Sequence, residues 1–246
     1  MPRARRRRPA QQPAAAGRRP APVWFFDLDD TLHDATQAIA ATIDRRMTDY
    51  VVRHLAVAQP QAEHLRLTYW RRYGATLLGL MRHHAVDPHH FLRETHDFDV
   101  LHLLRAERGL ARLFARLRGR KVLLTNAPQR YAQAIVRELA LHRQLDAHVS
   151  IERMRVHGTW RPKPSRALLR HMLAREGLAS RDQVHRALLV EDNPANLKAA
   201  RAVGFRTVLI TRHARRGPRG RSAYIDLRIR SVHELARRLP AAATRC

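Results

Sequence analysis

The stretch from Val23 to Leu32, with the sequence VWFFDLDDTL, constrains the fold more than any other part of this 246-residue chain. A short apolar run rich in aromatic residues is typical of a strand buried on both faces of a parallel sheet. Asp27 directly follows that run, and ligands of open α/β sheets bind at the carboxyl ends of the strands. Three carboxylates within four positions repel one another, so a cation is expected beside them. The simpler alternative is an acidic turn that caps the next helix.

The composition allows one large α/β domain, or a core domain with a smaller insert. Hydrophobic residues make up 45% of the chain, which is enough for a packed core. No apolar run approaches the roughly 20 residues needed to cross a bilayer, so we expect a cytoplasmic protein without a membrane partner. The single cysteine, Cys246, rules out a disulfide framework and a metal–thiolate site.

The chain is strongly basic, with a formal net charge of +26, but only three of its 47 basic residues are lysine. A basic surface attracts nucleic acid, whereas the excess of arginine over lysine favours a coding bias of a GC-rich genome as the explanation. Residues 1–22 combine seven arginines with prolines and alanines, and we expect this tail to be disordered. Nucleic-acid binding through the tail or the basic loop 212–221 is the alternative.

Residues 36–99 are predicted to form an all-helical cap, because apolar side chains recur there at helical spacing and no strand pattern interrupts them. Asp87 and Pro88 are typical of the start of the last of these helices. Residues 23–35 and 100–246 then form the catalytic core. The predicted organisation is a core interrupted by a cap just after its first strand.

Short apolar runs alternate with amphipathic helices after residue 100, which indicates a parallel sheet covered on both faces. The fold class predicted is therefore α/β, with a Rossmann-like parallel sheet and an inserted helical cap. A closing helix is expected over Ser231–Leu239. Beyond Val23–Phe26, strands are expected over Val122–Leu124, His148–Ile151, Ala187–Val190 and Arg206–Thr211.

Polar residues follow three of these strands: Asp27 and Asp29, then Thr125-Asn126, then Glu191-Asp192. They are expected to meet at one edge of the sheet. Lys163 lies between two prolines, and its compact charge suits a phosphate oxygen. One carboxylate can attack phosphorus, and a second can protonate the leaving oxygen and later deprotonate water. Oxygen ligands of this kind favour Mg²⁺.

These residues stand in the order and spacing of the four motifs of the haloacid dehalogenase superfamily, and the chain resembles that superfamily over residues 23–246. The resemblance implies that Asp27 is the nucleophile and Asp29 the general acid/base. It implies that Thr125, Asn126 and Lys163 bind the phosphoryl group. The dehalogenase branch lacks an acid two residues after the nucleophile, so Asp29 favours phosphoryl transfer.

The resemblance further implies that Asp27, the backbone carbonyl of Asp29, and Asp192 hold Mg²⁺. Many relatives carry a second acid four residues after the first acid of the fourth motif, where this chain has Asn196. The amide oxygen of Asn196 could still ligate, directly or through water, and Glu191 could help.

The segment Tyr69–Leu80 resembles the cap of pyrimidine 5′-nucleotidase-like proteins. This likeness implies a nucleoside 5′-monophosphate substrate, with a pyrimidine base favoured, whose base or sugar faces Arg72 or Tyr73. The alternative is that Trp70, Tyr73, Leu77 and Leu80 simply form the core of the cap. Another small phosphorylated metabolite, such as phosphoglycolate or a sugar phosphate, remains an alternative substrate, and we expect a monomer or homodimer.

Overall fold

The computed structural model describes residues 20–35, 38–212 and 222–238. Residues 1–19 of the tail and residues 213–221 of the basic loop lie outside the described residues, so the disorder predicted for the tail also lies outside them. The end of the expected tail is held against the core, since the carbonyl of Ala21 accepts hydrogen bonds from the Arg186 guanidinium at 2.9 and 3.1 Å. The carbonyl of Pro22 accepts one from the Arg120 amide at 3.2 Å.

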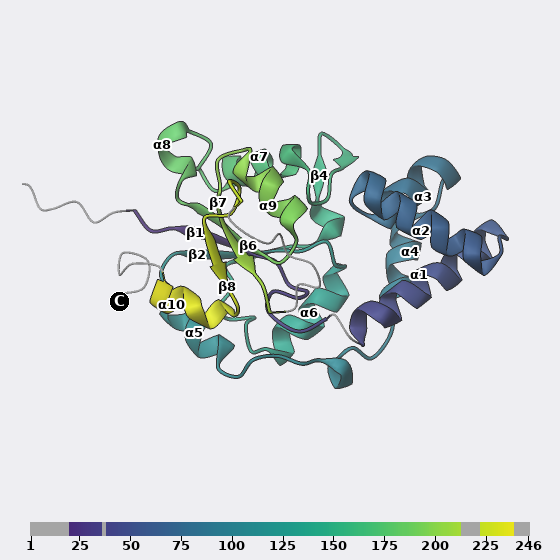
Figure 1. The fold of residues 1–246 in the computed structure, drawn as a ribbon, viewed down its shortest axis with the longest axis horizontal. Helices are drawn as coiled ribbons and strands as arrows, with labels where there is room; N and C mark the ends of the chain where they lie inside the picture. The colour runs from purple at the N-terminus through teal and green to yellow at the C-terminus, as the bar shows by residue number, and fades with distance from the viewer. Residues whose placement is uncertain (1–19, 36–37, 213–221, 239–246) are drawn as a thin grey trace, which may run out of the picture.

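Within the described residues, six parallel strands form one sheet in the order β3-β2-β1-β6-β7-β8 (Figure 1). The central strand β1 is buried on both faces, with Trp24 and Phe26 in one core cluster and Phe25 in the other. This alternation explains the continuous aromatic run in the sequence. The predicted α/β class is confirmed. The strands are β1 (Val23–Phe26), β2 (Arg120–Leu124), β3 (Ala147–Val149), β6 (Ala187–Glu191), β7 (Arg206–Ile210) and β8 (Leu227–Ile229).

Helices cover both faces of the sheet. The cluster around Trp24 includes buried side chains of α5 (Leu110–Arg116), α6 (Gln129–Glu138) and α10 (Leu235–Arg238). The cluster around Phe25 includes those of α7 (Arg166–Arg175) and α9 (Pro194–Arg201). A short helix α8 (Arg181–Val184) precedes β6. The sheet is thus the middle layer of three.

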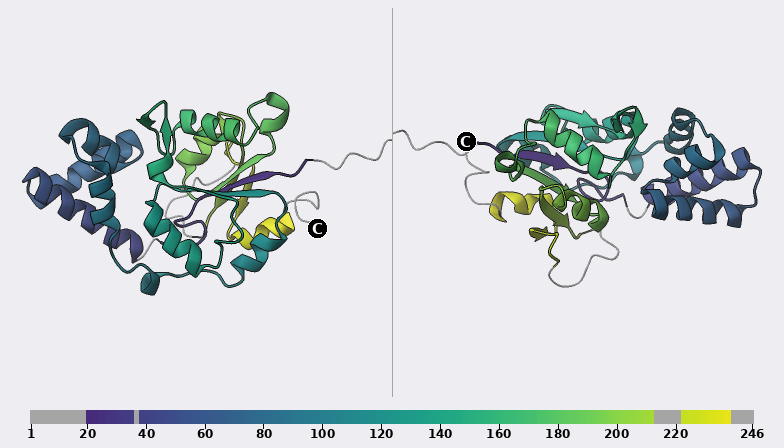
Figure 2. Two further views of the ribbon diagram at one scale, coloured as in Figure 1. Left: turned by 180° about the vertical axis from the view of Figure 1, so that it is seen from behind. Right: turned by 90° about the horizontal axis from the view of Figure 1, so that it is seen from above.

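Four helices lie in residues 38–97, between β1 and β2, and we call this segment the helical insert: α1 (Ile39–Leu55), α2 (Gln59–Tyr73), α3 (Thr76–His84) and α4 (Pro88–His96). The insert stands beside the sheet in both views of Figure 2. Its own core contains Tyr50, Leu80 and Phe91. The Asp87 carboxylate caps α4 by accepting hydrogen bonds from two backbone amides at 3.1 Å.

Some elements differ from the sequence-based expectations. The strand expected over His148–Ile151 ends at Val149, because Ile151 begins a 3₁₀ turn, η2 (Ile151–Arg153). The hairpin of β4 (Arg155–Val156) and β5 (Thr159–Trp160) was not predicted, nor was β8. Another 3₁₀ turn, η1 (Leu101–Leu103), follows the insert. The closing helix is a 3₁₀ turn, η3 (Val232–Glu234), continued by α10. Among the described residues, no helix is both long and apolar enough to span a bilayer.

Candidate active site

The carboxyl ends of β2, β1 and β6 place the predicted residues at one edge of the sheet. These strands are neighbours, and Phe26 of β1 lies in register with Leu123 and Val190. The amide of Asp27 donates a 3.0 Å hydrogen bond to the carbonyl of Val190, which ties the residue to the end of β6. Parallel pairing thus brings together residues separated by more than 160 positions.

Lys163 joins two carboxylates at this edge. Its Nζ lies 2.7 Å from Asp27 Oδ1 and 2.7 Å from Glu191 Oε2, and the side chain is 2% exposed. Asn126 holds the backbone of Lys163 in place, since its amide nitrogen donates to the Lys163 carbonyl and its amide oxygen accepts from the Lys163 N–H, both at 3.0 Å. The Asn126 side chain therefore positions Lys163. Both of its polar atoms are used in this way, so only the backbone of Asn126 is left to contact a phosphate group.

Thr125 is 1% exposed at the end of β2. Its hydroxyl oxygen accepts a 3.0 Å hydrogen bond from the Ala127 amide, and its own amide donates to the carbonyl of Val149. These bonds order the turn after β2. They place a hydroxyl group beside the chain segment that carries Asn126, as expected for a phosphoryl-binding turn.

The charges of this cluster influence one another strongly. Burial raises the pKa of Asp27 well above its ordinary value, the negative charge of Glu191 adds to the increase, and Lys163 opposes it. Burial also raises the pKa of Glu191. Burial alone would lower the pKa of Lys163, but the two carboxylates raise it overall. Lys163 thus stays charged, and its ammonium group is what favours an ionised Asp27.

The carboxylates of Asp27, Glu191 and Asp192 form an acidic cluster whose oxygens lie within 4.8 Å of one another. Burial, and then the charge of Asp27, raises the pKa of Asp192 to about 7. Three ionised carboxylates and one ammonium leave a formal charge of −2, which matches a divalent cation. An all-oxygen donor set suits a hard cation such as Mg²⁺, so these residues fit the metal that the sequence implied.

Asn196 is buried, with 6% of its surface exposed, on the first turns of α9. The neighbouring Asn193 caps α9 by accepting a 2.9 Å hydrogen bond from the Ala195 amide.

Asp29 follows Asp27 by two positions in the chain, and two hydrogen-bond donors hold its carboxylate. Its Oδ1 accepts a 2.7 Å hydrogen bond from the Tyr131 hydroxyl, and His33 Nε2 lies 3.0 Å from the same oxygen. Burial is the largest single influence and raises the pKa of Asp29, but the hydrogen bond and charge of His33, the hydrogen bond from Tyr131 and the charge of His96 together outweigh burial, so the pKa is lowered overall. The sequence reasoning missed Tyr131, because in α6 it shares the apolar face of Ile135 and its spacing is that of a core residue.

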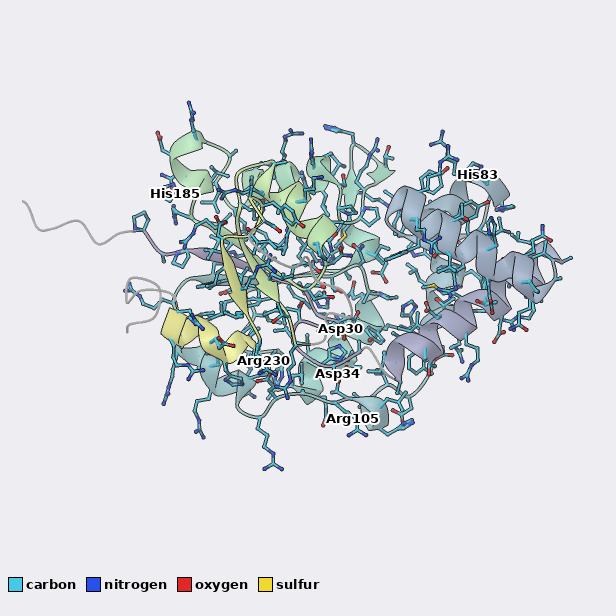
Figure 3. The ribbon with its side chains drawn as sticks, viewed as in Figure 1. Asp30, Asp34, His83, Arg105, His185 and Arg230 are labelled. Carbon is cyan, nitrogen blue, oxygen red and sulfur yellow. The ribbon has the colours of Figure 1, made fainter. Side chains whose placement is uncertain are left out.

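Asp30 has a structural part in the turn after β1. It adopts a left-handed backbone with φ of 57°, and its Oδ1 accepts a 2.9 Å hydrogen bond from the Ala35 amide. Figure 3 shows Asp30 close to Asp34, whose amide donates to the carbonyl of Arg105 at 2.7 Å. The turn therefore fixes the exit of the chain from β1 towards the helical insert.

Arg72 and Tyr73 line a cavity of about 710 Å³ between the end of α2 and the loops of the core. Asn126 and Lys163 line the same cavity. The Tyr73 hydroxyl lies 2.7 Å from His83 Nε2, and His83 projects from the outer surface of the insert (Figure 3).

The residues that were expected to form the core of the cap divide between core and surface. Leu77 and Leu80 are buried. Trp70 is 52% exposed at the cavity, so the expectation that it belongs to the core of the cap is wrong. Helical spacing gave the right periodicity, but Trp70 faces away from the buried side of α2.

The fold and the site define an α/β enzyme with a carboxylate cluster at the carboxyl edge of a parallel sheet. A family model described as haloacid dehalogenase-like hydrolase matches residues 23–204. The chain belongs to this family of hydrolases, and the superfamily predicted from the motifs is confirmed. The finer likeness to pyrimidine 5′-nucleotidases stays a prediction.

Solved structures share this fold at low identity. A HAD phosphatase from Thermococcus onnurineus is 18% identical with a TM-score of 0.58, over 92% of this chain and 100% of that one. CbbY from Rhodobacter sphaeroides, in complex with phosphate, is 19% identical with a TM-score of 0.59, over 87% and 95%. An L-2-haloacid dehalogenase from Xanthobacter autotrophicus, with chloropropionic acid covalently bound, is 18% identical with a TM-score of 0.51, over 87% and 96%. The neighbours include both a phosphatase and a dehalogenase, so the fold does not choose between the two reactions.

Proposed function

We propose that this hydrolase is a Mg²⁺-dependent phosphatase that cleaves phosphomonoesters through an aspartyl-phosphate on Asp27. The observation that carries the proposal is Asp29, an acid two residues after the nucleophile and held at the same edge of the sheet. A halide leaves carbon as a stable anion and needs no proton. An alkoxide leaving phosphorus does need one, and a carboxylic acid placed beside the nucleophile supplies it.

The residues divide the reaction between them. The reaction starts from the protonated form of Asp29, the minor form in the free protein because the pKa of Asp29 is lowered. A carboxylate oxygen of Asp27 attacks phosphorus, the ester P–O bond breaks, and Asp29 gives its proton to the leaving oxygen. Asp29 then takes a proton from the water that attacks the aspartyl-phosphate, which releases inorganic phosphate and restores Asp27. Lys163, 2.7 Å from Asp27, stabilises the negative charge that gathers on the phosphoryl oxygens. Thr125 and the backbone beside it hold those oxygens.

Asp27, Asp192 and the carbonyl of Asp29 are the residues that hold Mg²⁺ in this proposal, and the position of Glu191 in the acidic cluster allows it to assist. The bound cation would offset the charge of the carboxylates and of the phosphoryl group.

The substrate class we propose is a nucleoside 5′-monophosphate. The cavity of about 710 Å³ beside Lys163 lies within the range of typical ligand pockets. Its wall combines the guanidinium of Arg72 with the aromatic rings of Trp70, Tyr73 and Trp160. Aromatic rings can stack on any nucleobase, because every base has a π-face. A guanidinium can donate hydrogen bonds to a polar base edge or to the sugar.

A phosphatase screen tests both the proposed mechanism and the proposed nucleotide substrate. The purified protein is assayed with Mg²⁺ against UMP, CMP, AMP, phosphoglycolate and a sugar phosphate, beside an Asp27→Asn variant and a sample with excess EDTA. We expect cleavage of the nucleotides and no activity in either control. Cleavage of phosphoglycolate alone contradicts the nucleotide assignment, and full activity of Asp27→Asn contradicts the mechanism.

A further inference from the structure

Tyr131 touches the proton-transfer group of the site although no motif contains it. It lies on α6, 102 positions along the chain from Asp29, and its hydroxyl donates to Asp29 Oδ1 at 2.7 Å. His33 donates to the same oxygen from 3.0 Å. Since both donors occupy Oδ1, proton exchange with a substrate falls to Oδ2 of this carboxyl group.

The surroundings of Tyr131 fix where its hydroxyl can be. The residue is 4% exposed and belongs to the core cluster beneath the sheet. The ring of His96, the last residue of α4, packs edge-on against it at 5.5 Å between centroids, and Phe98 packs against it at 6.5 Å. Tyr131 also lines a cavity of about 460 Å³ between α4 and α6. The ring is thus confined by the core and by the insert, while its polar end meets the active site.

Asp29 itself lacks such confinement, because its side chain is 35% exposed. A partly exposed aspartate changes rotamer readily and exchanges its partners with water. Two donors on one oxygen remove this freedom, and only the Tyr131 donor comes from an element outside the turn that follows β1.

We propose that Tyr131 is a positioning residue for the proton transfer by Asp29. Its hydroxyl fixes the carboxyl group so that Oδ2 faces the leaving oxygen of the substrate. This inference rests on the proposed function, in which Asp29 is the general acid. Asp29 activates water in the second step with every substrate, but kcat/KM reports only the steps up to departure of the leaving group. The inference therefore predicts that loss of the Tyr131 hydroxyl lowers kcat/KM only where the leaving group requires a proton.

Two substrates with different leaving groups test this. UMP loses an alkyl alcohol, which is a weak acid and needs protonation, whereas 4-nitrophenyl phosphate loses a stable phenolate. Tyr131→Phe removes only the hydroxyl and keeps the ring. We expect kcat/KM for UMP to fall by about tenfold and that for 4-nitrophenyl phosphate by less than about twofold, as general-acid contributions are of this order or larger. If UMP is not cleaved, β-glycerol phosphate serves as the alkyl substrate.

The ratio of the two kcat/KM values does not depend on how much of the sample is folded, because both are measured on one preparation. An equal loss on the two substrates, or no loss on either, overturns the inference. Tyr69→Phe is the matched control: it also removes a buried tyrosine hydroxyl that lies 2.7 Å from a histidine nitrogen, here His84 in the helical insert. This variant should leave the ratio unchanged.

The Asp29→Asn variant tests the acid role of Asp29 separately from the positioning role of Tyr131. A loss that is selective for the alkyl substrate in Asp29→Asn, but absent in Tyr131→Phe, refutes only the role of Tyr131. Equal losses on both substrates in Asp29→Asn refute the acid role of Asp29 and with it the proposed function.

Discussion

Replacing Lys163 by methionine should destabilise the fold in a way that depends on pH. The substitution keeps an apolar side chain of similar length and removes the only ammonium group beside Asp27 and Glu191 among the described residues. Removing one partner of a buried ion pair typically costs 3–5 kcal/mol, so we expect a loss of about 4 kcal/mol at pH 8. That loss corresponds to a fall in Tm of roughly 10 °C for a chain of this size.

The pH dependence follows from the raised pKa values of Asp27 and Glu191. A carboxyl group whose pKa is higher in the folded state than in the unfolded state loses stability as pH rises between those two values. Without Lys163 the folded pKa values rise further, so this window extends upwards. Both groups are protonated to a larger extent at pH 5 than at pH 8, so we expect a smaller loss at pH 5 than at pH 8.

Urea denaturation at pH 5 and pH 8, in EDTA, measures the two losses. Lys198→Met is the control, because Lys198 is exposed on α9. The double variant Lys163→Met/Glu191→Gln should recover part of the loss, because it removes one of the two stranded carboxylates. A loss below about 1 kcal/mol at pH 8, the size of a surface ion pair, would refute the reasoning, as would equal losses at the two pH values.

Further substitutions test other parts of the structure. Gly79→Ala should destabilise the helical insert by about 1–3 kcal/mol in urea, because the added Cβ collides with the Tyr69 ring; unchanged stability contradicts that packing. Ser165→Ala should lower stability by about 1 kcal/mol through loss of its cap on the Leu168 amide, and an unaltered urea midpoint argues against the cap. Asp192→Asn should raise the Mg²⁺ concentration for half-maximal phosphatase activity by at least about tenfold; an unshifted Mg²⁺ titration removes Asp192 from the metal site.

The sequence predicted the parts of the site that lie at the ends of strands. Asp27 and Glu191 each follow an apolar run, and the parallel pairing that such runs favour brings their ends together. Lys163 was found by a different signal, since lysine is rare in this chain and here lies between two prolines. The positions of Asp27 and Glu191 at strand ends could be predicted because a buried strand leaves a strong pattern in the sequence; the roles of these residues stay predictions.

The parts that escaped prediction depend on tertiary contacts. The spacing of Tyr131 is that of a core residue, and only the fold reveals that its hydroxyl reaches Asp29. Trp70 follows the helical period as closely as its buried neighbours, yet it faces the cavity. Strands β4 and β5 have two residues each, too few for an alternating pattern to appear.

Three loops that are distant in sequence act as one unit around Asp27, the nucleophile of the proposed reaction. Burial and the charge of Glu191 favour a protonated Asp27, and a protonated carboxyl group is a poor nucleophile. Lys163 opposes both effects, and Asn126 holds the backbone that presents Lys163. The ionised state of Asp27 therefore depends on a chain of contacts from Asn126 through Lys163. Because each link acts through the next, the loss of Asn126 and the loss of Lys163 cannot be independent, and their effects on activity must be less than additive.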